Sequence, residues 1–198
     1  AEWFCKISLS KAMVTEDKDA QIEAYKSIIN HAQKFIELYP DNPVWYAYIG
    51  FSSGRIAIAL NGPSAVPYQK QIEESAKKAI SLKPDYYLPY LNLGVYYRRA
   101  ATLNPVMKFV VNTFLGGSIS NASLKDSLEM LNKSKLLAAK KPLIWYELGI
   151  TYKMMNKNSE ALAAFEEVIR LPISAWGDSK IKAIATQQIK KIHMESRN

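Results

Sequence analysis

The sequence predicts an all-α fold, a solenoid of antiparallel helical hairpins that ends in a capping helix. The first observation is a recurring motif, in which an aromatic residue is followed three positions later by Leu or Ile and then by Gly. The second is that the amphipathic segments between these motifs end in proline, which stops a helix. The motif glycines are Gly50, Gly94 and Gly149, and the closing prolines are Pro40, Pro84 and Pro172.

The motif at residues 145–152 explains why such a unit folds as a hairpin. Trp145, Leu148 and Tyr152 lie on one helix face at i, i+3, i+7 spacing. Gly149 and Ala161 are small, which lets two antiparallel helices approach closely. This is the pattern of the tetratricopeptide repeat, a helix–turn–helix unit of about 34 residues. We therefore predict a tetratricopeptide-like solenoid of about three to four repeats with two insertions, in which each hairpin packs on its neighbours.

The repeats divide a single predicted domain, residues 1–198, into consecutive segments. We expect repeats at approximately 1–40, 43–84, 87–140 (with an insertion at 104–121) and 142–173, followed by a capping helix at 178–194.

Helix-start signals agree with these boundaries. Asn42-Pro43 places a capping residue before a proline at the first helical position, and Pro142 is placed in the same way. Asn158 is expected to cap the following helix. SLKD at 123–126 resembles a capping box with Asp in place of Glu.

The spacing between the motif glycines exceeds the repeat period of about 34 residues twice, which indicates two insertions. The first contains Gly62, Pro63 and Pro67. The second carries a dense apolar run at 106–115, and three interpretations stay open. The favoured one extends the preceding helix and fills the groove as core. The others are a lid over a ligand cavity and a segment that dips into a membrane surface. Asn104-Pro105 predicts a kink or a new helix start.

Longer stretches of the chain resemble a known family. They include HAQKFIELYPDNPVWYAYIG, FLGGSISNASLKDSLEMLNKS and LPISAWGDSK. They resemble the tetratricopeptide domain of the regulator of microtubule dynamics family, especially its shorter bacterial relatives. A mitochondrial outer-membrane tether that interacts with a tyrosine phosphatase shares this domain. The sequence departs from the family where Gly94 is followed by Val95 and Tyr96, since the family tends to have Trp and often His there.

The resemblance implies a non-enzymatic adaptor. Eukaryotic members are associated with microtubules or with contacts between the endoplasmic reticulum and mitochondria, and the tether's domain with phospholipid binding and transfer. Both a protein partner and a lipid are therefore expected ligand classes.

Counting from the motif glycines places an apolar concave groove with a basic rim on the first helices of the repeats. Such a groove suits an apolar peptide with acidic flanks or an anionic amphiphile. We predict a scaffold that binds a peptide or protein segment. The alternative is a carrier of a lipid or fatty acyl chain with the 105–115 insertion as its lid. The predicted groove residues are Ala47, Phe51, Arg55, Leu91, Val95, Arg98, Arg99, Phe109, Phe114, Tyr146, Ile150 and Met154.

Composition excludes several other classes. The net charge is +8, but the basic residues are scattered, so no nucleic-acid partner is expected. No run reaches the roughly 18 apolar residues of a membrane span, so membrane contact is at most peripheral. Two histidines and the single Cys5 form no metal-ligand pattern, and no catalytic motif occurs, so we expect no metal, no cofactor and no enzymatic activity.

The compartment and the oligomeric state stay open. A start without Met is compatible with an exported or periplasmic bacterial protein, and a cytoplasmic location is the alternative. The N-terminal segment EWFCKISLS would end the solenoid and is a candidate surface for self-assembly.

Overall fold

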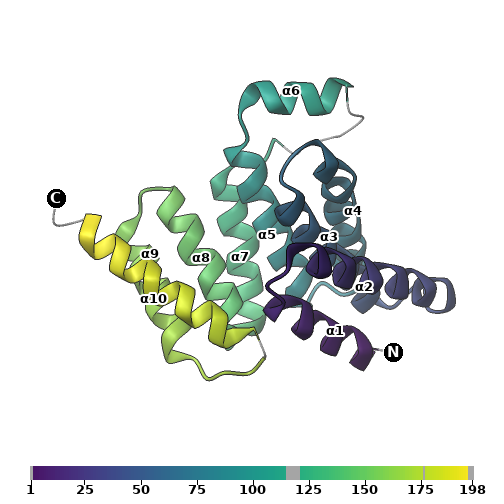
Figure 1. Cartoon of the computed structure of the whole chain (residues 1–198), viewed down its shortest axis with the longest axis horizontal. Coiled ribbons are helices and arrows are strands. Elements are labelled where there is room, and N and C mark those ends of the chain that lie inside the picture. Colours follow the sequence, from purple (N-terminus) through teal and green to yellow (C-terminus); the bar gives the residue numbers. More distant parts are fainter. Residues whose placement is uncertain (1, 115–120, 176, 196–198) are drawn as a thin grey trace.

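The computed structural model describes residues 2–114, 121–175 and 177–195. Within these residues the chain forms ten α-helices, one short 3-10 helix and no strand (Figure 1). The prediction of an all-α solenoid with a C-terminal capping helix is confirmed. The helices are α1 (Glu2–Val14), α2 (Lys18–Leu38), α3 (Pro43–Leu60), η1 (Pro63–Ala65), α4 (Val66–Leu82), α5 (Tyr87–Thr102), α6 (Pro105–Phe114), α7 (Leu124–Ala138), α8 (Pro142–Met154), α9 (Asn158–Arg170) and α10 (Asp178–Glu195).

Most helices pack on their neighbours in the chain, as expected of stacked hairpins. α1 packs on α2, α3 on α2 and α4, and α8 on α9, while α10 covers α9 and part of α8. The exception is α5, which packs mainly on α7 because α6 stands outside the stack (Figure 1).

The helix starts follow from local hydrogen bonding. The side-chain oxygen of Asn42 accepts a hydrogen bond from the Val44 amide at 3.0 Å, which satisfies an otherwise unpaired donor at the start of α3. Ser123 and Asp126 form the predicted capping box at the start of α7. Asn158 does not cap α9 as expected, because it is already the first helical residue and Lys157 holds the cap position.

Two motif glycines are required by close helix packing. A Cβ atom on Gly149 would lie 2.6 Å from the ring of Phe165, a side chain of α9 with no exposed surface. A Cβ atom on Gly94 would lie 2.6 Å from Cγ of Leu131 on α7. Both distances are shorter than van der Waals contact, so the sequence motif marks where the two helices of a hairpin touch.

The second insertion folds differently from the favoured prediction. Leu103 is extended, and the Asn104 side chain accepts a hydrogen bond from the Val106 amide at 2.8 Å, so a new helix starts at Asn104-Pro105 as expected. The resulting helix, α6, lies across the ends of other helices and does not continue α5 (Figure 1). Val106 and Phe109 are 69% and 62% exposed. The interpretation that this segment fills the groove as core is therefore wrong.

Candidate ligand-binding groove

A cavity of about 370 Å³ lies between α3, α5 and α8, the first helices of three successive hairpins, and we call it the central cavity. Its size is typical of small-ligand and side-chain binding sites. The central cavity brings together most of the predicted groove residues. They are Phe51, Arg55, Leu91, Val95, Arg98, Arg99, Ile150 and Met154.

Four predicted groove residues do not line the central cavity. Ala47 is fully buried in the core, where its carbonyl accepts a hydrogen bond from the Asn92 side chain at 3.0 Å. Tyr146 packs against α9, with its ring centre 6.1 Å from that of Phe165. Phe109 is on α6, and no described residue of α6 lines the cavity. The side chain of Phe114 lies outside the described part of the structure.

The floor of the central cavity is apolar. Phe51 from α3, Leu91 and Val95 from α5, and Leu143 and Ile150 from α8 supply most of it. Each of these side chains belongs to the inward face of its helix, so the helical period places them on one surface. An apolar floor of this kind favours a ligand that removes apolar surface from water.

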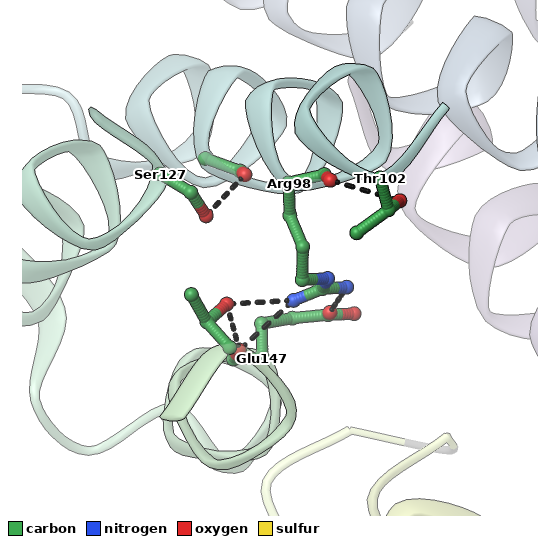
Figure 2. A network of polar contacts seen from close by, with 6 residues as sticks. Arg98, Thr102, Ser127 and Glu147 are labelled. Atoms are coloured by element: carbon green, nitrogen blue, oxygen red, sulfur yellow. Dashed lines mark hydrogen bonds and ion pairs between the residues drawn. The ribbon is translucent and has the colours of Figure 1, made fainter. Parts of the chain in front are cut away.

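A buried polar network joins two walls of the cavity (Figure 2). Arg98 reaches from α5 to α8, where Nη1 donates to the Glu147 carbonyl at 2.9 Å and to Oγ1 of Thr151 at 3.1 Å. Nη2 pairs with the Glu147 carboxylate. Arg98 and Glu147 are only 7% and 4% exposed. A buried charge must be paired, so this network fixes α5 relative to α8.

The network corrects the predicted role of Arg98. The sequence suggested a cation on the groove rim, but the side chain is buried and its donors are directed to α8. Glu147, its partner, was not among the predicted groove residues. A signal was present, because Glu147 is the one charged residue of the segment IWYELGITY. Its partner lies 49 positions earlier, a separation that periodicity does not detect.

Arg99 and Arg55 are the cations that remain for a ligand. Both line the central cavity and are half-buried, and no carboxylate among the described residues forms an ion pair with either. Burial lowers the pKa of Arg99, and the neighbouring Arg98 acts in the same direction while Glu147 opposes it. The Arg55 guanidinium lies 5.0 Å from the centre of the Phe51 ring, a cation–π contact. Partly dehydrated guanidinium groups in this arrangement attract a carboxylate or phosphate.

The described residues hold no group of three or more His, Cys, Asp or Glu side chains placed to bind a metal ion. Among the described helices, none has the length and apolar character needed to span a bilayer.

Comparison with known proteins identifies the family. The family model described as Regulator of microtubule dynamics protein 1-3 matches residues 2–193, nearly the whole chain. No curated protein matches significantly. Among solved structures, the crystal structure of MamA is 17% identical, covers 91% of this chain and 90% of its own, and superimposes with a TM-score of 0.40, a likeness too distant to carry functional argument. The family match confirms the resemblance seen in the sequence: the chain belongs to the regulator of microtubule dynamics family.

Proposed function

We propose that this protein is a non-enzymatic scaffold that binds a protein segment in the central cavity. The segment presents an apolar side chain to the floor and an acidic group to Arg55 and Arg99. One observation carries the proposal: two half-buried arginines without a carboxylate partner in the described structure border an apolar cavity.

The two parts of the cavity have separate tasks in this proposal. Burial of an apolar anchor on Phe51, Leu91 and Ile150 supplies most of the binding free energy, at about 25 cal/mol per Å² of apolar surface. Arg99 and Arg55 select for an acidic neighbour, since electrostatic complementarity mainly gives specificity and fast association. Arg98 takes no direct part, because its donors already bind Glu147 and Thr151.

The location supports a macromolecular partner. The inner helices of solenoid proteins create extended surfaces that bind other chains. The central cavity lies on three such helices, and Met154 at its edge is 47% exposed. A flexible thioether at an open edge can adapt to the side chains of a bound segment.

The test compares capture of partners by the wild type, Arg99→Gln and Lys180→Gln. Lys180 is an exposed lysine of α10 outside the cavity lining, so its neutralisation changes the net charge equally. We expect the wild type and Lys180→Gln to retain the same protein from a lysate of the source cells, identified by mass spectrometry. Arg99→Gln should lose it, and added salt should weaken retention. Equal retention by all three proteins would place the binding surface elsewhere.

A fatty acyl carrier is the second candidate, and the cavity size favours it. About 370 Å³ is within the range of small-molecule sites, and the two arginines suit an acidic head group. The predicted lid has no support in this arrangement, because no described residue of α6 lines the cavity. Native mass spectrometry of the purified protein, before and after organic extraction, separates the candidates. A bound mass that extraction removes favours the carrier, and a bare protein that does not take up added dodecanoate favours the scaffold.

A further inference from the structure

A second cavity of about 510 Å³ lies directly beyond the central cavity, and we call it the lateral cavity. It is enclosed by α1, α3, the starts of α5 and α8, and the turn before α10. Phe51, Leu91 and Leu143 line both cavities. These three side chains therefore form a shared ridge with one pocket on each side.

The lateral cavity, like the central cavity, is lined by apolar side chains together with basic ones. Leu9, Met13, Tyr48 and Ile144 contribute to an apolar interior. Lys141 at the start of α8 and Lys6 of α1 also line it and are exposed, which shows that the cavity opens to solvent.

One acidic residue, Asp178, lines the lateral cavity, but its carboxylate already accepts hydrogen bonds from the turn that precedes α10. Oδ2 of Asp178 accepts hydrogen bonds from the Ser174 amide at 2.7 Å, the Ser174 hydroxyl at 3.0 Å and the Ala175 amide at 2.8 Å. Asp178 is also 4% exposed. Its carboxylate therefore holds the turn before α10, and the exposed charged side chains that line this cavity are those of Lys6 and Lys141.

We propose that the two cavities are paired pockets for one bound segment, which crosses the ridge and places an apolar anchor on each side. The segment carries an acidic residue at both ends, one facing Arg55 and Arg99 and the other facing Lys141. This inference rests on the proposed scaffold function and extends it by naming the motif of the partner: acidic, apolar, apolar, acidic.

The ridge makes two anchors the better fit than one long side chain. Phe51 is 7% exposed and is held by packing in the main core and by the cation–π contact with Arg55. It does not swing aside without losing these contacts, so a single side chain reaches one pocket only. Two anchors on either side of a fixed ridge bury apolar surface in both pockets, and two fixed pockets set the register of the segment.

The basic residues at opposite ends fix the composition of the flanks. Three arginines of the central cavity face a single glutamate, so positive charge is in excess there. Lys141 and Lys6 supply positive charge at the far end. A segment with one acidic end would satisfy one mouth and leave the other without a counter-charge. Charge complementarity therefore favours acids at both ends.

The experiment selects binders from a displayed library of random linear peptides, with four immobilised proteins: the wild type, Arg99→Gln, Lys141→Gln and the control Lys180→Gln. Each variant removes one positive charge, and circular dichroism and thermal melting verify that each is folded. The enriched sequences are compared position by position. A synthetic consensus peptide from the wild-type selection is then titrated against all four proteins.

The wild type and Lys180→Gln should enrich peptides with two bulky apolar residues at a fixed separation and an acid on each flank. Arg99→Gln should weaken the acid preference on one flank only and Lys141→Gln on the other, since Arg55 lines the first cavity and Lys6 the second. The consensus peptide should bind each of these two variants about two- to fivefold more weakly, as expected for a partly exposed ion pair.

Two results would overturn the inference. Peptides with a single anchor and a single acid, enriched equally by the wild type and Lys141→Gln, would show that only the central cavity binds, and the scaffold function would stand. Absence of any enriched peptide, together with binding of dodecanoate by the same protein, would overturn the scaffold function itself in favour of the acyl carrier.

Discussion

The α8–α9 hairpin and helix α6 are both rich in apolar residues, yet their phenylalanine side chains differ in burial. Phe165 of α9 has no exposed surface, and it contacts α8 where Gly149 leaves room for its ring. Phe109 of α6 is 62% exposed. Apolar content is therefore not what buries a helix in this protein. A helix is buried where a neighbouring helix has a complementary small residue, and α6 follows a proline-directed break that takes it out of the stack.

The largest expected effect comes from breaking this complementarity inside the hairpin. Phe165→Ala removes a fully buried ring and leaves a cavity between α8, α9 and α10. We expect a loss of about 3–5 kcal/mol in the free energy of unfolding, measured by urea denaturation. The matched change Phe109→Ala on α6 should cost less than about 1 kcal/mol. Similar costs for both changes would contradict the comparison.

The next largest effect on stability is expected from the buried polar network between α5 and α8, in which α6 takes no part. Glu147→Ala leaves the Arg98 guanidinium buried without its counter-charge. Removing one partner of a buried pair typically costs about 3–5 kcal/mol. We expect a value near the lower end, because Arg98 keeps its bonds to the Glu147 carbonyl and to Thr151.

The double variant Arg98→Met with Glu147→Leu separates charge from packing. Apolar side chains of similar size often replace a buried pair without loss, so we expect the double variant to recover most of the stability. If it is as unstable as Glu147→Ala in urea denaturation, the network acts through shape and not through charge.

The same contrast explains what the sequence could and could not predict. The hairpins were predictable because the aromatic–Leu–Gly motif records a contact between helices that are adjacent in the chain, such as Gly149 with Phe165. The place of α6 was not predictable, since an apolar run records no partner. Arg98 and Arg99 are adjacent in the sequence, and only the position of Glu147 in space decides which of them is paired.

Helix α1 is intermediate in burial between the α8–α9 hairpin and α6. Its Phe4 is 40% exposed and contacts the ring of His31 on α2 in a tilted arrangement, with ring centres 4.5 Å apart, and Phe35 contacts the same ring at 4.9 Å. Nε2 of His31 is buried and has no hydrogen-bond partner among the described residues. Burial lowers the pKa of His31 from its ordinary value of 6.5, and the charge of Lys34 acts in the same direction.

The lowered pKa of His31 determines whether folding stability rises or falls with pH. The unfolded chain binds a proton at His31 at higher pH than the folded chain does, so folding stability decreases as the pH falls below 6.5. His31→Gln should remove this part of the decrease, and the exposed His193→Gln should not. The measurement is the difference in urea midpoint between pH 7.5 and pH 5 for the three proteins. An unchanged difference in His31→Gln would show that protonation of His31 does not contribute to the pH dependence.

The smallest effects are expected on α6 itself, where one helix offers its own control. Phe109→Asp changes a largely exposed side chain and should alter the free energy of unfolding by less than about 1 kcal/mol, mainly through helix propensity. Val111 is 3% exposed and packs on Val66 and Ala100, so it is the described contact that seats α6 on the body of the protein.

Val111→Asp should therefore release α6 while the stacked hairpins stay folded. Hydrogen exchange should show faster exchange of the α6 amides in Val111→Asp, with the exchange of α8 and α9 unchanged, and neither change in Phe109→Asp. Global unfolding by Val111→Asp would make α6 part of the core after all. Slow exchange of α6 in both variants would mean that contacts other than Val111 hold it. The expected pattern, local release without loss of the hairpins, follows because Val106 and Phe109 are largely exposed, so the attachment of α6 and the folding of the solenoid can be separate equilibria.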